Sequence, residues 1–236
     1  MPQKNSRKDY GAGGYYHIFN RGVEKRDIFL DEQDYKVFLG YLKFYLEVSK
    51  PQSLEDQALK CLGSTCGEKV FPSRASKNYQ DQIELLAYCL MPNHFHFLVK
   101  QSTDRGIAEF MQSLILKYVL YFNKKYKRVG GLFQSRYKTV LVENESQLTY
   151  LTKYIHRNPV DILSSRPGFE KSVDLIDYRY SSYGNYLGFI TQNWVKAGEI
   201  LSYFKSVGHR NSYQSFVMEE VDDLKLVYYE MIDLDG

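Results

Sequence analysis

The segment MPNHFHFLVK at 91–100 decides the fold of this chain, because it predicts one half of a β-hairpin. An apolar run, IELLAYCL at 83–90, comes directly before it, and the Met-Pro-Asn tripeptide between them supplies a turn. Successive side chains of a strand point to opposite faces, so His94 and His96 share one face while the two phenylalanines share the other. We expect the phenylalanine face to be buried and the two imidazoles to lie side by side.

The histidine pair has two interpretations. Two neighbouring imidazoles on a strand backed by a buried aromatic face can bind a metal ion. The alternative is an alternating strand with two exposed histidines. The chain has only five histidines, and two of them fall on one face of one strand, which favours the metal site.

The segments on either side of the hairpin extend it to an α+β fold. Apolar residues alternate in the predicted strands and recur every three or four positions in the predicted helices. The order matches the split βαβ pattern of a ferredoxin-like antiparallel sheet with helices packed on one face. The expected elements are a strand at 15–19, a helix capped by Asp31, strands at 83–90 and 94–100, a helix from Thr103 or Asp104, a strand at 134–142, and a helix that begins at Asn144 or Ser146 and ends before Pro159.

The chain is expected to have two parts. The sheet and its helices would form a core at 1–165, interrupted by a polar stretch at about 49–80 that is rich in Ser, Lys, Gly and Pro and reads as a long insertion. The remainder, 166–236, looks like a mostly helical C-terminal extension. At 236 residues, one domain with an extension or two small domains are both reasonable.

Composition indicates a cytoplasmic protein. The N-terminal segment has no apolar signal-peptide region. The longest apolar helical stretch, around 107–122, contains Glu109 and Lys117 and is too short and polar to span a bilayer. The three cysteines show no metal-ligand spacing, which fits reduced thiols.

Charge is unevenly distributed along the chain, although the net charge is only +3. Seven basic and no acidic residues lie between 117 and 138, whereas the tail from Met218 holds seven acidic residues and one lysine. This pattern suggests a polyanion-binding face, with an ordinary solvated helix face as an equally good alternative. The 22 tyrosines would suit stacking on unpaired bases.

The last predicted core helix carries a second group of polar residues within TYLTKYIHRNPV at 149–160. Tyr150, Tyr154 and Asn158 are spaced by four and form a stripe beside the apolar face of this helix. His156 lies on roughly the opposite side from Asn158, so it is a poor candidate ligand. A tyrosine hydroxyl, with a pKa of about 10, becomes a useful nucleophile where a divalent cation polarises a phosphodiester. For Tyr154 alone, boundary packing would be the simpler interpretation.

Taken together, these residues resemble the HUH single-strand endonucleases with one catalytic tyrosine, which are transposases of insertion sequences, and above all their REP-associated tyrosine transposase branch. The resemblance covers nearly the whole chain in the family's order. It rests on YHIFNRG (16–22), YCLMPNHFHFLV (88–99), GLFQSRYK (131–138), YIHRNPV (154–160) and YRYSSY (178–183).

The resemblance implies a role for several residues. His94 and His96 would bind Mg²⁺ or Mn²⁺, and Asn158 would complete the metal site, where many relatives have Gln. Tyr154 looks like the nucleophile that takes a 5′-phosphate, and Tyr150 ranks second. The family's substrates are single-stranded DNAs with imperfect hairpins, and some relatives are homodimers while others act alone.

Basic residues would then bind the DNA backbone. Asn20 and Arg21 sit where the family contacts DNA. The other candidates are Lys124, Lys125, Lys127, Arg128, Arg136 and Lys138. Two alternatives remain: a catalytically silent nucleic-acid-binding module on the same fold, and a metal-dependent phosphoesterase that uses water. The complete set of His94, His96 and Tyr154 favours an active enzyme over the silent module.

Overall fold

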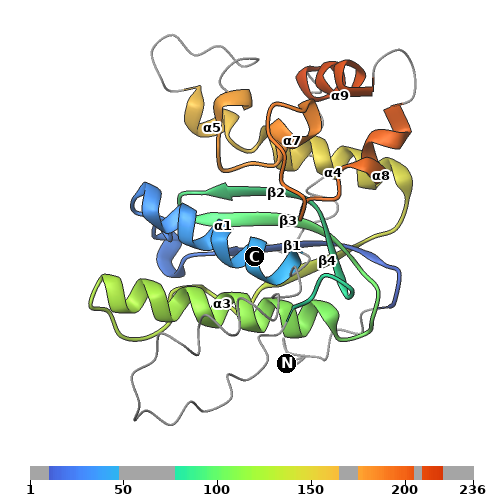
Figure 1. Cartoon of the computed structure of the whole chain (residues 1–236). Coiled ribbons are helices and arrows are strands. Elements are labelled where there is room, and N and C mark those ends of the chain that lie inside the picture. The colour runs from blue at the N-terminus through green and yellow to red at the C-terminus, as the bar shows by residue number, and fades with distance from the viewer. Residues whose placement is uncertain (1–10, 48–77, 165–174, 205–208, 220–236) are drawn as a thin grey trace, which may run out of the picture.

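The computed structural model describes residues 11–47, 78–164, 175–204 and 209–219. Four strands form one antiparallel sheet in the order β2-β3-β1-β4 (Figure 1). This order confirms the predicted ferredoxin-like sheet. The strands are β1 (Tyr15–Arg21), β2 (Ile83–Met91), β3 (His94–Gln101) and β4 (Lys138–Val142).

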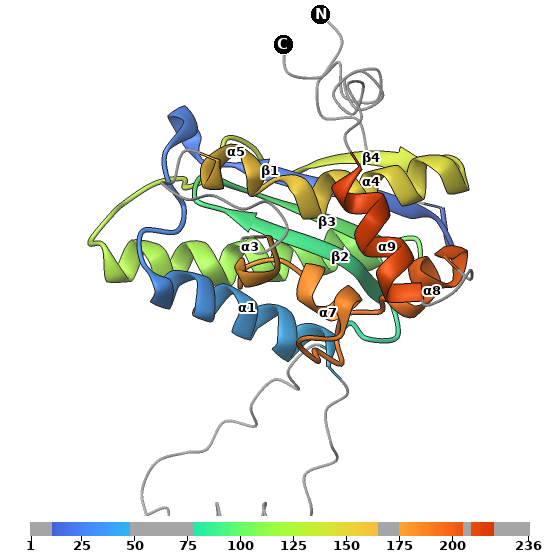
Figure 2. The ribbon, with the colours of Figure 1, turned by 90° about the horizontal axis from the view of Figure 1, so that it is seen from above.

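Helices cover both faces of the sheet. Helices α1 and α3 pack on one face, and α4 packs on the other face together with the shorter helices that follow it (Figures 1 and 2). The prediction of helices on one face therefore describes α1 and α3 only. The helices are α1 (Glu32–Leu46), α3 (Gly106–Lys125), α4 (Glu145–Arg157), α5 (Val160–Leu163), α7 (Tyr183–Leu187), α8 (Gly198–Leu201) and α9 (His209–Met218), with 3-10 turns η1 (Val23–Lys25) and η2 (Ser202–Phe204).

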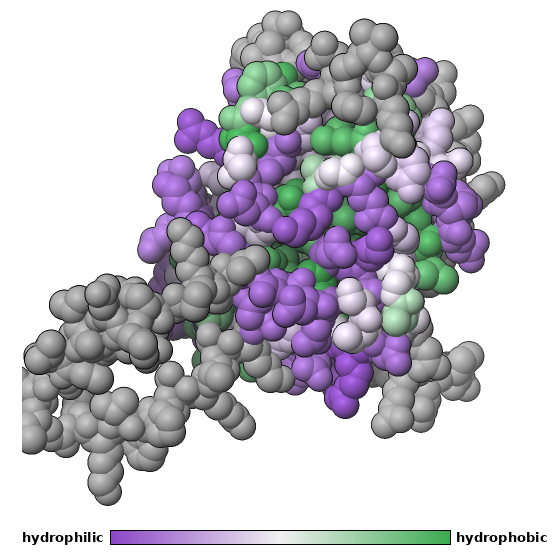
Figure 3. All heavy atoms as spheres, turned by 45° about the vertical axis from the view of Figure 1, so that its right-hand side comes forward, coloured by the Kyte–Doolittle hydropathy of each residue, from purple (hydrophilic) through white to green (hydrophobic). Residues whose placement is uncertain are grey.

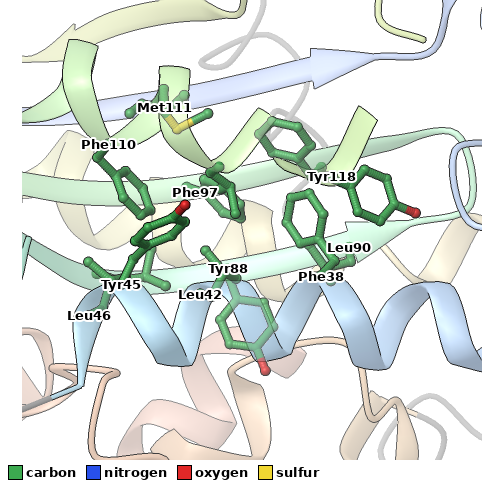
Figure 4. Packing of buried hydrophobic residues seen from close by; sticks show 14 of the residues in the cluster. Phe38, Leu42, Tyr45, Leu46, Tyr88, Leu90, Phe97, Phe110, Met111 and Tyr118 are labelled. Atoms are coloured by element: carbon green, nitrogen blue, oxygen red, sulfur yellow. The ribbon is translucent and has the colours of Figure 1, made fainter. Parts of the chain in front are cut away.

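The face that carries α1 and α3 holds an aromatic core, which confirms the predicted burial of the phenylalanines of β3. Phe95 and Phe97 are fully buried, and the Phe38 ring of α1 lies 5.6 Å and 6.2 Å from theirs between centroids (Figure 4). Tyr118 of α3 meets Phe38 edge-on at 4.8 Å. Since β3 alternates, this packing turns His94 and His96 to the opposite face, toward α4.

Two helix starts follow the sequence signals. The Asp31 side chain accepts a hydrogen bond from Asp34 N and caps α1, and the Asn144 side chain accepts from Gln147 N and caps α4. Helix α4 ends at Arg157, directly before Asn158, as the following proline predicts. Both caps fix where the amphipathic stripes of their helices begin.

Strand β4 is shorter than the predicted 134–142. The residues before it pair instead with the end of β1: Gln134 N donates to Arg21 O, and Val23 N donates to Leu132 O. Ordinary strand pairing with β1 therefore begins only at Lys138, opposite Phe19. The pairing of residues 132–134 with the end of β1 brings the basic residues before β4 to the end of the sheet where β3 begins.

The C-terminal part is less helical than predicted where the structure describes it. Residues 175–204 form short helices joined by turns, and they hydrogen-bond to β2: Leu90 N donates to Tyr180 O, and Lys196 N donates to Leu85 O. The predicted boundary at 165 lies outside the described residues. The predicted insertion at 49–80 is described only from Asn78, and Tyr79 there is buried against α1.

On the face shown in Figure 3, hydrophilic side chains predominate and apolar ones appear in the gaps between them. None of the helices in the described residues has the length together with the apolar composition that a bilayer-spanning segment requires.

A buried polar network holds α4 to α7 and α9. His156 is fully buried; its Nδ1 lies 2.6 Å from the Tyr213 hydroxyl of α9, and its Nε2 lies 2.8 Å from Ser182 Oγ. Burial lowers the pKa of His156 to about 3, so the ring is neutral at physiological pH. One ring nitrogen accepts a hydrogen bond and the other donates one.

Replacing His156 by leucine should therefore destabilise the protein without touching the sheet. The change leaves the buried Tyr213 hydroxyl without its imidazole partner and removes one partner of Ser182. We expect the free energy of unfolding to fall by about 2–4 kcal/mol, as measured by urea denaturation. The control is Thr149→Ala, because the Thr149 hydroxyl is exposed and bonds only carbonyls of its own helix. Equal stability of the two variants would contradict this role.

Candidate active site

The structure brings together the four side chains that the sequence singled out for metal binding and nucleophilic attack. The rings of His94 and His96 lie 5.0 Å apart between centroids on the face of β3 toward α4. The Tyr154 ring meets His96 edge-on at 5.4 Å. Asn158 Oδ1 lies 3.5 Å from His94 Nε2. Strand β3 and helix α4 therefore place a histidine pair, a phenol and an amide around one point.

Of the two candidate tyrosines, Tyr154 lies at the histidines. Its ring lies 6.4 Å from that of His17 as well as 5.4 Å from that of His96. The Tyr150 ring instead meets Phe216 of α9 edge-on at 5.6 Å. Although they are one turn apart on α4, these two tyrosines therefore have different neighbours, and Tyr154 is the one beside the histidines.

Donor atoms at the site suit a divalent cation. Asn158 Nδ2 donates to Tyr154 O at 3.1 Å, which turns the Asn158 carbonyl oxygen toward His94. Two ligands that share one ion at roughly 2.1 Å lie roughly 3–3.5 Å apart, and the separation of 3.5 Å between Asn158 Oδ1 and His94 Nε2 falls in that range. Among the described residues, no three His, Cys, Asp or Glu side chains are placed so that they could hold a metal ion together, so a metal site here would need the Asn158 amide beside the imidazoles.

A third histidine belongs to this cluster and escaped sequence reasoning. His17 of β1 is buried, its ring stacks on that of His96 at 5.1 Å, and its Nε2 lies 2.9 Å from His96 Nδ1. Burial lowers the pKa of His17 to about 3, and burial together with the adjacent His94 holds the pKa of His96 well below its ordinary value. Both rings are therefore neutral, which is the form that binds metals.

The signal that could have found His17 is the alternation of β1. His17 and Phe19 lie on the same face of that strand, and His17 stands opposite Leu98 in the register with β3. The register itself is a tertiary property, because it depends on how two strands far apart in sequence align. Without it, His17 looks like any histidine in a half-buried strand.

Two of the predicted DNA-binding cations flank the histidines. Arg21 pairs with His94 across the β1–β3 ladder, and its positive charge contributes to the lowered pKa of His96. Lys138 pairs with Phe19 across the β1–β4 ladder, and its Nζ lies 5.7 Å from the centroid of the Phe19 ring. Directly paired residues share a face, so both cations lie on the histidine face.

Asn20, which was predicted to contact DNA, is instead buried and engaged in the fold. It is 3% exposed, and its Nδ2 donates to the carbonyls of Ser135 and Arg136 at 3.0 Å and 2.9 Å. Its Oδ1 accepts from Arg21 N. The Asn20 amide therefore ties β1 to the segment before β4.

The remaining basic candidates divide into exposed and engaged side chains. Lys125 Nζ lies 2.7 Å from carboxylate oxygens of both Asp31 and Asp34, so its charge is neutralised within the fold. The Arg128 guanidinium lies over the Phe122 ring at 5.7 Å. The three that are exposed are Lys124, Lys127 and Arg136.

Comparison with known proteins gives one family match. Residues 60–158, which contain both histidines of β3, Tyr154 and Asn158, match the family described as "Transposase IS200 like". No curated protein sequence matches the chain.

The solved structures to which the chain is similar include the following two. One is described as the "REP associates tyrosine transposase bound to a REP hairpin"; the match has a TM-score of 0.48 and 15% identity, and covers 84% of this chain and 93% of that one. The other is the tRNA(His) guanylyltransferase from Saccharomyces cerevisiae, with a TM-score of 0.36 and 11% identity, over 94% of this chain and 87% of that one.

Proposed function

We infer from the match of residues 60–158 that the chain belongs to the IS200-like transposase family, and we propose that it cuts and rejoins single-stranded, hairpin-containing DNA through a 5′-phosphotyrosine intermediate. The observation that carries the proposal is the convergence of His94, His96 and Asn158 with the Tyr154 phenol. Structural packing alone would not require two imidazoles and an amide oxygen beside a tyrosine.

The metal ligands in this proposal are His94, His96 and Asn158. An Mg²⁺ or Mn²⁺ ion bound there would act as a Lewis acid on the scissile phosphate. The lowered pKa of His96 keeps its ring nitrogen available as a ligand at neutral pH. Nitrogen donors together with an amide oxygen suit Mn²⁺ and tolerate Mg²⁺.

Tyr154 supplies the nucleophile. Its Oη loses the hydroxyl proton and forms a bond to phosphorus, while the bond from phosphorus to the 3′-oxygen breaks and that oxygen leaves as a hydroxyl after taking up a proton. The 5′-phosphate stays on Tyr154. Attack by the 3′-hydroxyl of a second strand reverses these bond changes and joins the DNA, so no ATP is required.

Arg21 and Lys138 hold the DNA backbone near the nucleophile in this proposal. Both cations lie on the histidine face of the sheet, Arg21 at the end of β1 and Lys138 at the start of the neighbouring β4. Charge-assisted contacts from them to phosphate oxygens would orient the strand and offset the charge that develops during attack.

The proposal is tested with end-labelled single-stranded hairpin DNA, the protein and Mn²⁺, analysed on a denaturing gel. A slower band that survives denaturation and disappears with EDTA is the expected result. Binding in a native gel without any adduct, across varied hairpins and metals, would instead identify a silent binding module. Cleavage without an adduct would identify a phosphoesterase that uses water.

The basic residues of the α3 end should differ in their contribution to DNA binding. The double variant Lys124→Ala/Lys127→Ala removes two exposed charges, so we expect weaker DNA binding at low salt. The salt slope, which is the fall of the logarithm of the binding constant with the logarithm of the salt concentration, should be smaller by about 1.4, at about 0.7 per lost phosphate contact. Lys125→Ala should leave that slope nearly unchanged, because this charge is already paired with Asp31 and Asp34.

Fluorescence anisotropy of a labelled hairpin over a series of salt concentrations measures both slopes. Lys125→Ala should lower the unfolding temperature more than the double variant does, since it leaves the fully buried carboxylate of Asp34 without its cation. Loss of salt slope in Lys125→Ala equal to that of the double variant would contradict the assignment.

A further inference from the structure

The Asn93 side chain, in the turn between β2 and β3, forms a hydrogen bond at each end of its amide. Its Nδ2 donates to Lys25 O at 3.2 Å, and its Oδ1 lies 2.5 Å from His94 Nδ1. A backbone carbonyl can only accept, so the amide nitrogen must face Lys25. The Asn93 oxygen therefore faces the His94 ring.

This orientation determines where the proton of His94 sits. The Asn93 oxygen is an acceptor, so His94 Nδ1 must be the donor and carry the hydrogen. In a neutral imidazole the other nitrogen, Nε2, then presents a lone pair. Because His94 Nε2 points to Asn158, the ring is oriented along a line from Asn93 to α4.

The partner on the far side is also an acceptor. Asn158 Nδ2 donates to Tyr154 O, so Asn158 Oδ1 is the atom that lies 3.5 Å from His94 Nε2. Two lone pairs that face each other at this distance repel, and a cation that both could coordinate would turn the repulsion into attraction.

From this geometry we propose that Asn93 is a positioning residue, which holds His94 in the Nδ1–H tautomer so that Nε2 is presented to a metal ion shared with Asn158. The inference rests on the proposed function for its purpose, although the tautomer exists without metal or DNA. Asn93 is not a ligand; it acts through His94.

The turn that carries the Lys25 carbonyl, which accepts the hydrogen bond from Asn93, is rigidly held. Glu24 and Lys25 both adopt left-handed backbone conformations, with φ of 57° and 59°, which are strained for residues other than glycine. Gly22 N donates to Asn93 O at 2.8 Å, and a Cβ at Gly22 would lie 2.2 Å from Arg26 O, so only glycine fits there. A fixed and strained turn that aims one carbonyl at one side chain is typical of functional sites.

The test is the tautomer of His94, read from the ¹⁵N chemical shifts of its ring nitrogens in metal-free protein at a pH where the ring is neutral. The wild-type protein should show the Nδ1–H form. Asn93→Ala should shift His94 toward the Nε2–H form, which can donate to Asn158, and should weaken Mn²⁺ binding about 10–100-fold in a calorimetric titration. Asn93→Asp keeps an acceptor beside Nδ1 and should restore the wild-type tautomer.

The matched control is Asn123→Ala. The Asn123 amide, at the C-terminal end of α3, also donates to a backbone carbonyl, that of Gly130, so its loss should leave both the tautomer and Mn²⁺ affinity unchanged. An Nε2–H form in the wild-type protein would overturn the inference, as would an unchanged tautomer in Asn93→Ala. If the Nδ1–H form is found and depends on Asn93 while no DNA adduct ever forms, the positioning role stands and the proposed DNA chemistry fails.

Discussion

Tyr154→Phe is expected to abolish the covalent protein–DNA adduct and to reduce strand cleavage by on the order of 10³-fold or more. The substitution removes one oxygen and keeps the ring that lies 5.4 Å from His96 and 6.4 Å from His17. Folding and metal binding should therefore survive, since the ring contacts remain. The measurements are the denaturing gel of the labelled hairpin with Mn²⁺, and a native gel to show that DNA binding is retained.

Tyr150→Phe is the matched control for this prediction. It deletes the same atom from the same helix one turn earlier, where the ring contacts Phe216 of α9 rather than the histidines. Its adduct should form at the wild-type rate. Adduct formation that persists in Tyr154→Phe and disappears in Tyr150→Phe would reverse the two assignments.

His96→Ala is the second change with a large expected effect. We expect Mn²⁺ affinity to fall more than about 100-fold in a calorimetric or electron paramagnetic resonance titration, and the DNA adduct to disappear with it. The reason is that the His96 ring lies between His94, His17 and Tyr154, so no neighbouring donor can replace its nitrogen without moving the strand.

Loss of packing must be separated from loss of a ligand in this experiment. Leu98→Val is the control for lost packing, because Leu98 is the next buried residue on the same face of β3 and its side chain carries no metal-binding atom. It should lower stability modestly and leave Mn²⁺ affinity unchanged. Wild-type Mn²⁺ affinity in His96→Ala would remove His96 from the proposed site.

Much of the fold could be predicted because its signals are local. The alternation in 94–100 assigns the phenylalanines and histidines to opposite faces, and the caps at Asp31 and Asn144 mark the starts of two helices. The packing on the second face was harder to foresee. The described residues after 174 form short helices whose hydrogen bonds go to β2, and such segments have little periodicity of their own.

In the candidate site too, local patterns could be predicted from the sequence, whereas contacts between distant segments could not. The strand period puts His94 and His96 on one face and the helix period puts Tyr154 and Asn158 on one stripe, whereas the convergence of His94 with Asn158 was implied by the family resemblance. The place of His17 depends on strand register. The neutralised charge of Lys125 and the internal hydrogen bonds of Asn20 depend on partners that are distant in sequence. A residue's type shows what it can bind, whereas its actual partner is set by the tertiary fold.

Side chains of α4 contact α9, and these contacts limit how the candidate site could be transferred to another protein. Tyr150 contacts Phe216 of α9, and His156 contacts Tyr213. The Arg157 guanidinium donates to the carbonyls of Val217 and Glu219 at the end of α9. All of these anchors on α9 lie beyond residue 158, where the family match ends. A graft of the matched segment alone would transfer His94, His96, Tyr154 and Asn158 but leave behind both β1, with His17 and Arg21, and the α9 side chains that hold α4.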